Sequence, residues 1–393
     1  MAIREVKLGK VATVKGGKRL PKGINLITKP NSHPYIRVRD LNGKKTLELD
    51  GSFEFVDDET QKAISRYIVT GGDIVLSIVG TIGLVSVVGD SLNEANLTEN
   101  CVKLTSLSGI DRDYLYYYLK SSYGQQEIAR GTVGAVQAKL PIKNIQDISI
   151  PLPDEVTQRK IADILSSLDA KIEVNQRIND NLQQQAFSVF DNLIANAENN
   201  DYTVSDYAFL NPKRTLAKNQ VSRSIDMSQL STSGAFPSGW EMKPFNGGMR
   251  FTNGDTLLAR ITPCLENGKT AFIDFLDDGE VAFGSTEYIV LAPKNDTPPE
   301  MLYCLARYPA FVDYAVKNMN GSSGRQRVSA ETVGQYRLPL FDKHSLVLFK
   351  EVVSPMFLKM RYNSLENMRL AELRDALLPK LMSSEINVSA VQL

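Results

Sequence analysis

The chain has 393 residues, which is enough for two or three domains of about 100–200 residues each, and its 42% hydrophobic and 23% charged content is that of an ordinary globular protein. It contains no run of about 18 apolar residues and no apolar N-terminal core, so we expect no membrane span, no secretory signal and a cytoplasmic location. Its 45 basic residues balance 45 acidic ones, yet residues 1–39 hold ten lysines and arginines against one acid, Glu5.

This basic N-terminal part contains a glycine-rich segment, residues 15–23, with the sequence KGGKRLPKG. Glycines let a backbone approach a phosphate closely, and the cations supply the charge that a nucleic-acid backbone attracts. We therefore take Lys18, Arg19 and Lys22 as candidate DNA contacts. The alternative is a solvated surface loop that binds nothing.

A β-type run follows at residues 34–38. Arg37 and Arg39 flank Val38, so on a strand both guanidinium groups would lie on one face. Two parallel guanidinium groups suit contact with guanine or phosphate, which makes both arginines candidate DNA contacts. The alternative is that they form ion pairs with the acid-rich stretch at residues 40–59.

Further β-type runs lie at residues 73–79 and 84–88, and a helical pattern follows at residues 111–119. Its tyrosines have the spacing of core packing rather than of base stacking; they are Tyr114, Tyr117 and Tyr118. The second half repeats this order, with β-type runs at residues 256–259 and 287–291 and a helical pattern at residues 300–306. We expect each half to hold an α+β region with a curved sheet and one or two helices.

Two glycine-bearing loops of the first half have counterparts in the second. Residues 131–139 (GTVGAVQAK) match residues 321–327 (GSSGRQR), and residues 79–83 (VGTIG) match residues 260–263 (RITP). Glutamine can pair with adenine and arginine with guanine in the major groove. The candidate DNA contacts from these loops are Thr81, Gln137, Lys139, Arg260, Ser322, Arg325, Gln326 and Arg327.

Each half ends in a long helical pattern whose apolar residues recur at steps of four and three, the heptad pattern. The first runs from about residue 157 to 194 and returns 188 residues later with a pair of asparagines at its middle. We expect the interface between the two helices to consist of Ile161, Leu165, Leu168, Ile172, Asn175, Asn179, Leu182, Phe349, Val353, Met356, Met360, Asn363, Asn367 and Leu370. Arg374 interrupts the second seam, where Leu373 could fill the gap, and Pro355 either kinks the helix or marks its start.

The two seams are too narrow for a globular core, so pairing as an antiparallel coiled coil would bury both. A globular region precedes each helix, and the pairing would put the two regions at opposite ends of a rod of about 50 Å. The asparagines would fix its register. Ordinary helix packing within one globule is the alternative. The predicted fold class is α+β, with two globular α/β domains separated by two long helices that form an antiparallel coiled coil.

Residues 150–153 (IPLP), with Gln158 and the first seam behind them, resemble the central conserved region of the specificity subunits of type I restriction-modification systems. Residues 377–386 (LLPKLMSSEI) are similar to the usual C-terminus of that family. The chain departs from the family pattern at Thr157, where glutamate is commoner, and residues 341–344 (FDKH) lack the glutamine in the second half. The resemblance assigns target recognition domains to residues 1–152 and 199–340 and conserved helices to residues 153–198 and 341–393.

The resemblance implies that each domain reads one half of a bipartite site on double-stranded DNA. The helices would dock two modification subunits, which bind S-adenosylmethionine and methylate adenine N6. Two restriction subunits, which are translocases and nucleases that use ATP and Mg²⁺, would complete the assembly. The chain itself would hold no cofactor.

The sequence agrees with a subunit that does no chemistry of its own. Its two histidines, His33 and His344, lie in different halves, and it has neither a Walker phosphate loop nor the Asp/Asn-Pro-Pro-Tyr/Phe motif of methyltransferases. Cys101, Cys264 and Cys304 form no metal-binding pattern. We expect a DNA-specificity subunit that is not an enzyme and binds no metal. The alternatives are a coiled-coil scaffold whose domains bind proteins, and a specificity subunit of a type IIB-like system.

Overall fold

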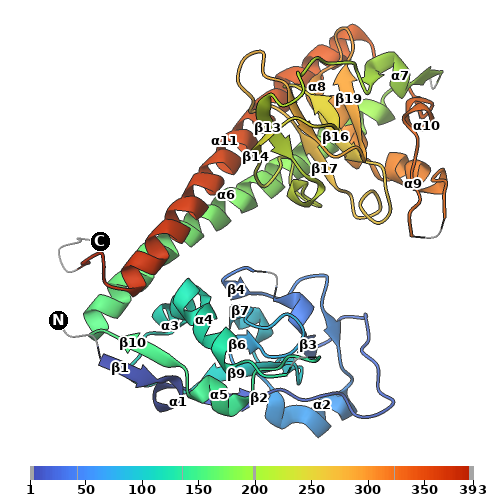
Figure 1. Cartoon of the computed structure of the whole chain (residues 1–393). Coiled ribbons are helices and arrows are strands. Elements are labelled where there is room, and N and C mark those ends of the chain that lie inside the picture. The colour runs from blue at the N-terminus through green and yellow to red at the C-terminus, as the bar shows by residue number, and fades with distance from the viewer. Residues whose placement is uncertain (1–3, 42, 135, 198–200, 323, 389–393) are drawn as a thin grey trace. The chain divides into compact units, whose positions relative to one another are not determined.

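The computed structural model describes residues 4–41, 43–134, 136–197, 201–322 and 324–388. The chain divides into two compact units (Figure 1): the first is Met1–Ala170 with Ala371–Leu393, and the second is Lys171–Leu370. The division passes through both long helices, α6 (Glu155–Ala195) and α11 (Lys343–Met382). Each unit therefore combines a globular domain with one part of each helix. Within the described ranges, no helix is long and apolar enough to cross a membrane.

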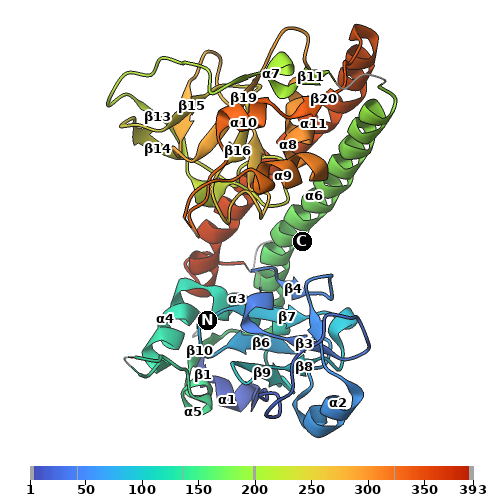
Figure 2. The same ribbon diagram turned by 90° about the vertical axis from the view of Figure 1, so that its right-hand side faces the viewer.

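A five-stranded sheet forms the centre of the first unit, and Figure 2 shows β6, β7 and β9 of it side by side. Its strand order is β2 (Thr13–Gly16), β9 (Cys101–Thr105), β6 (Ile74–Ser77), β7 (Val85–Val88) and β4 (Thr46–Leu47). A second sheet holds β5 (Glu54–Phe55), β3 (Pro34–Ile36) and β8 (Asn96–Leu97), and β1 (Arg4–Lys7) pairs with β10 (Ser149–Leu152). Its helices are α1 (Leu8–Val11), α2 (Asp58–Ile64), α3 (Arg112–Lys120), α4 (Ser122–Gly131) and α5 (Ile142–Gln146).

The second unit has two four-stranded sheets. One has the order β12 (Ala208–Leu210), β19 (Tyr288–Pro293), β16 (Thr256–Ala259) and β17 (Thr270–Phe272). The other has the order β14 (Glu241–Pro244), β13 (Val221–Ile225), β18 (Ala282–Gly284) and β15 (Met249–Phe251), and β11 (Tyr202–Thr203) pairs with β20 (Arg337–Leu338). Its helices are α7 (Val204–Tyr207), α8 (Pro299–Arg307), α9 (Pro309–Lys317) and α10 (Ala330–Gly334).

The two globular domains repeat one plan. In each, a central strand lies between two antiparallel neighbours, β6 between β9 and β7 in the first unit and β16 between β19 and β17 in the second. In each, a parallel pair joins an early strand to a later one, β3 to β8 and β13 to β18. The aspartate that precedes each central strand is buried, Asp73 in one domain and Asp255 in the other. The predicted repeat is therefore confirmed at the level of individual strands.

The two long helices pack antiparallel, which confirms this part of the predicted fold. In the second unit Asn175 donates to Asn367 at 2.9 Å, and Asn363 donates to Asn179 at 2.8 Å. The partner number falls as the first number rises, as antiparallel pairing requires. The predicted seam residues are all buried or half-buried.

The ends of both seams are part of the domain cores, which the heptad argument alone did not predict. Ile161 and Leu165 of α6 join Leu378 and Leu381 of α11 in the core of the first unit. In the second unit, residues of α6 and α11 are likewise part of the domain core; they are Ala186, Phe190, Phe349, Val353, Phe357 and Met360. Each domain thus shares a hydrophobic core with the parts of the helices that pack against it.

The structure corrects two details of the second seam. Helix α11 begins at Lys343, so Pro355 does not mark its start. Leu373 does not fill the gap at Arg374, because its side chain is exposed. Arg374 instead forms an ion pair of 2.7 Å with Asp169 of α6, and Asp169 also accepts a hydrogen bond of 2.6 Å from the hydroxyl of Tyr117. The seam is polar at this point because the domain supplies a hydrogen-bonding partner.

The tyrosines of α3 are core residues, as the spacing predicted. Tyr114, Tyr117 and Tyr118 are all buried, and the Tyr114 hydroxyl donates to the carbonyl oxygen of Pro151 at 2.6 Å. The cysteines are buried or half-buried and form no disulfide among the residues that the structure covers.

Candidate nucleic-acid interface

Each domain carries one loop that backbone bridges hold at its base. The first pinned loop, residues 133–139, is closed by Val133 and Lys139, whose backbones exchange two hydrogen bonds of 2.9 Å. Lys139 also bridges to Val79, two residues after strand β6 ends. Lys139 is thus bridged on both sides, which fixes the base of the loop.

The second pinned loop, residues 320–327, is built in the same way. Asn320 and Arg327 exchange two backbone hydrogen bonds of 2.9 Å, and Arg327 also bridges to Ile261, which follows strand β16. The next residue adds a further bond, from Val328 N to the carbonyl oxygen of Arg260 at 3.0 Å. Both loops thus lie beyond the carboxyl end of the central strand of their domain.

A glycine at the start of each pinned loop lets the chain turn back on itself. Gly134 has φ +98°, and a Cβ there would lie 2.6 Å from the carbonyl oxygen of Gln137. Gly321 has φ +130°, and a Cβ there would lie 3.1 Å from the carbonyl oxygen of Arg325. A side chain would be strained at both positions, which explains why both loops need glycine there.

This geometry corrects the sequence alignment of the two loops. The sequence pattern pairs Gly131 with Gly321, but Gly131 is the last residue of helix α4. The bridges instead make Gly134 equivalent to Gly321 and Lys139 equivalent to Arg327. The second pinned loop is one residue longer, and Gln137 corresponds to Arg325 rather than to Arg327, with which the sequence alignment pairs it.

An ion pair holds the base of the second pinned loop. Arg327 donates from Nε and Nη2 to the carboxylate of Glu287 at 2.7 to 3.0 Å, and Arg260 Nε lies 3.8 Å from the same group. The hydrogen bonds from Arg327 lower the pKa of Glu287. The guanidinium of Arg327 is therefore engaged within the domain, whereas Ser322 and Arg325 are exposed and Gln326 is half-buried.

In the first domain the glycine-rich segment is less open than the sequence suggested. Lys15 and Gly16 belong to strand β2, and Gly17 packs so tightly that a Cβ would lie 2.0 Å from the carbonyl oxygen of Thr98. Gly17 is thus required by packing on the domain rather than by approach to a ligand. Lys18, Arg19 and Lys22 follow it and are exposed, and Arg19 forms an ion pair of 2.6 Å with Glu99.

The prediction that Arg37 and Arg39 share one face of a strand is wrong. Strand β3 ends at Ile36, and Val38–Asp40 is a turn of 3₁₀ helix. Both arginines form ion pairs with Glu54, at 3.1 Å for Arg39, and Arg39 also lies 3.4 Å from Asp40. Burial raises the pKa of Asp40 to about 6 in spite of Arg39. The ion pairs with the following acids, the alternative reading of this segment, are what the structure shows.

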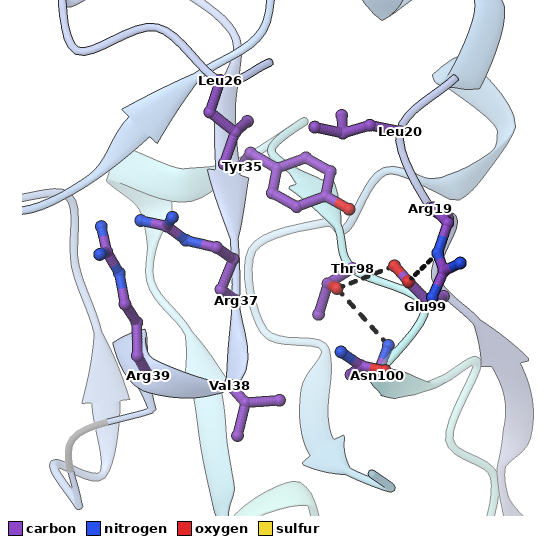
Figure 3. A pocket seen from close by; sticks show the side chains of 10 residues that line it. All are labelled: Arg19, Leu20, Leu26, Tyr35, Arg37, Val38, Arg39, Thr98, Glu99 and Asn100. Carbon is purple, nitrogen blue, oxygen red and sulfur yellow. Dashed lines mark hydrogen bonds and ion pairs between the residues drawn. The ribbon is translucent and has the colours of Figure 1, made fainter. Parts of the chain in front are cut away.

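A pocket of about 380 Å³ brings these arginines together with residues that the sequence did not single out (Figure 3). Its lining residues are Arg19, Leu20, Leu26, Tyr35, Arg37, Val38, Arg39, Thr98, Glu99 and Asn100. Nε and Nη2 of Arg37 are buried there without a hydrogen-bond partner among the described residues. No local pattern marks Thr98 and Asn100, because only tertiary folding brings strand β8 and its following turn beside β3.

Asn100 connects this pocket to the first pinned loop. Its carbonyl oxygen accepts hydrogen bonds from Ile78 N at 2.8 Å and from Val79 N at 3.3 Å, and Val79 bridges to Lys139. Thr81 lies in the turn that follows, is exposed, and accepts a hydrogen bond of 2.6 Å from Ser77 through its carbonyl oxygen. The candidate contacts of the first domain thus come from neighbouring turns at one edge of its sheet.

Residues 3–184 match the family model described as the type I restriction modification DNA specificity domain. The type I restriction enzyme HindI specificity subunit of Haemophilus influenzae is 24% identical over 63% of this chain and 71% of its own length. The MjaIX specificity subunit of Methanocaldococcus jannaschii is 21% identical over 90% of this chain and 87% of its own.

The fold has a counterpart among solved structures. The crystal structure of the type I restriction-modification S subunit from M. genitalium superposes with a TM-score of 0.56 at 18% identity. The superposition covers 97% of this chain and 96% of that one, so both domains and both long helices have equivalents there.

Proposed function

We propose that the chain is a specificity subunit of a type I restriction-modification system and that it reads a bipartite site on double-stranded DNA, one half with each globular domain. It acts in the cytoplasm and does no chemistry of its own. Sequence is read by side chains that reach base edges, whereas contacts to phosphate position the protein.

The observation that carries this proposal is the repeated pinned loop. Two domains of one plan each present a loop at the same edge of the sheet, with Gln137 and Lys139 on one and Ser322 and Arg325 on the other. One framework with different side chains suits a protein that reads two different half-sites. Loops held by a rigid framework are the usual place for recognition residues.

The long helices have a second role in this proposal, as the docking site for two modification subunits. Their outer faces expose apolar side chains, among them Val174 and Ile178 on α6 and Val352, Leu358 and Tyr362 on α11. Val174 and Ile178 also line a shallow groove together with Leu182. Apolar surface of this kind is typical of an interaction site.

The partners supply the chemistry. The modification subunits bind S-adenosylmethionine and methylate adenine N6. Two restriction subunits use ATP and Mg²⁺ to translocate and cut DNA.

The test is adenine-methylation mapping by long-read sequencing of cells that express this chain with its modification subunit. We expect one new methylated motif made of two short parts with a fixed gap. Cells with the modification subunit alone are the control and should lack the motif. An intact complex of the two proteins that methylates no defined motif would contradict the proposal and favour a scaffold.

A further inference from the structure

The two pinned loops differ in length, yet three points along them are structurally equivalent. The positive-φ glycine is the first point, at Gly134 and Gly321. The second is the residue whose carbonyl oxygen packs over that glycine, Gln137 in one loop and Arg325 in the other. The bridge residue, Lys139 or Arg327, is the third. The extra residue of the second loop therefore lies between its glycine and Arg325.

At the second point the side chain is exposed to solvent. Gln137 and Arg325 are both exposed, and neither side chain has a hydrogen bond or ion pair within the described part of the chain. Their neighbours differ in this respect. Arg327 is held by Glu287, and the backbone of half-buried Gln326 accepts a hydrogen bond of 3.0 Å from Thr262 N.

A side chain with these properties can read one base. The bridge and the glycine turn fix its backbone, so little conformational entropy is lost on binding. Its polar atoms are available for hydrogen bonds. Glutamine forms a bidentate pair with adenine N6 and N7, and arginine forms one with guanine O6 and N7. The two loops therefore present side chains that prefer different bases at equivalent backbone positions.

We propose that Gln137 and Arg325 occupy the same base-reading position in the two domains, so that the first domain reads adenine there and the second reads guanine. This inference rests on the proposed function and specifies the contact within it. Gln326 and Arg327 are not readers in this scheme, because Arg327 holds the base of the loop and Gln326 lies beside it.

The test exchanges the two side chains. Full-length chains with Gln137→Arg or Arg325→Gln are purified in complex with the modification subunit and used to select from a randomised duplex DNA library, and the bound DNA is sequenced. We expect Gln137→Arg to change one adenine of the first half-site to guanine, and Arg325→Gln to change one guanine of the second half-site to adenine. Each exchange should shift the preference at that base by about ten- to a hundredfold.

Three further variants separate a reading role from a general one. Gln137→Ala and Arg325→Ala should relax the same two positions without a new preference. Gln326→Ala is the matched control from the same loop and should leave the selected motif unchanged. A selected motif that is identical for the wild type, Gln137→Ala and Gln137→Arg would overturn the proposal for the first domain, and the corresponding result for Arg325 would overturn it for the second.

Failure of the proposed function gives a different result. In that case the wild-type complex itself selects no motif. A wild-type motif that survives both exchanges leaves the function intact and refutes only the assignment of these two residues.

Discussion

At the scale of single residues, ion pairs within a domain determine which arginines are available to contact DNA. Arg37, Arg39 and Arg327 each have carboxylate partners within 4 Å, whereas Arg325 has none among the residues described. A guanidinium that is already paired must lose its partner before it binds a base, and this cost disfavours it as a reader. Composition alone does not separate these arginines, because their partners Glu54 and Glu287 lie 15 to 40 positions away in the chain.

Asp255 makes the stability of the second domain dependent on pH. Its side chain is buried, it accepts the backbone N–H of Thr252 at 2.8 Å, and it pairs with Arg214 at 2.5 Å. Burial raises its pKa to about 6, above its ordinary value of 3.8. The folded chain therefore binds this proton more tightly than the unfolded chain, so the contribution of Asp255 falls as the pH rises through the window from about 4 to 6.

We predict that the free energy of unfolding of the wild type rises relative to that of Asp255→Asn by about 1 kcal/mol when the pH is lowered from about 7 to about 5. Asparagine keeps the shape and cannot titrate, so the difference between the two proteins isolates this carboxyl. Urea unfolding of the full-length chains at both pH values measures it. A difference that stays constant over this range would show that the carboxyl is not protonated in the folded chain.

At the scale of elements, the helix pair α6 and α11 carries a buried polar layer. Asn179 accepts a hydrogen bond of 2.8 Å from Asn363 and donates to Ser364 Oγ at 3.2 Å. Asn175 and Asn363 are almost completely buried. A buried polar group costs free energy when its partner is lost, so this layer favours the one register in which the amides meet.

We predict that Asn179→Ala destabilises the chain by about 1–3 kcal/mol, because it leaves the buried amide of Asn363 without its acceptor. Replacing Asn179 and Asn363 together with leucine should recover most of this loss, since no polar group then remains unpaired. Asn181→Ala, an exposed position on the same helix, is the control and should change stability by less than about 0.5 kcal/mol. Denaturant unfolding measures all three, and a double variant less stable than Asn179→Ala would contradict this account.

The helices were the most predictable elements of the chain. Their heptad periodicity is a local signal, and the hydrogen bond between Asn363 and Asn179 agrees with the prediction that the repeated asparagines fix the register. The role of Arg374 could not be predicted in the same way, because its partner Asp169 lies 205 residues away. A heptad pattern says which face is buried, but the domains decide what packs against the ends of that face.

At the scale of the whole molecule, the repetition of one domain plan made the strands and loops of the two halves recognisable in the sequence. Strands β6 and β16 were predicted as β-type runs at residues 73–79 and 256–259, and each lies between two antiparallel neighbours. The loops were recognised as equivalent but aligned three residues apart at their glycines. A Gly-x-x-Gly pattern occurs in both segments, and the sequence alignment follows it. Structural equivalence depends instead on backbone bridges to Val79 and Ile261, which only tertiary folding brings to the loops.

Mapping of adenine methylation tests whether each domain reads its own half of the site. Adenine methylation is mapped in parallel for the wild type, for Gln137→Ala with Lys139→Ala, and for Ser322→Ala with Arg325→Ala, each with the modification subunit. We expect each double variant to relax the sequence of one half-site and to leave the other half and the gap unchanged. Relaxation of both halves by either variant, or of the same half by both, would contradict the division of recognition between the two domains.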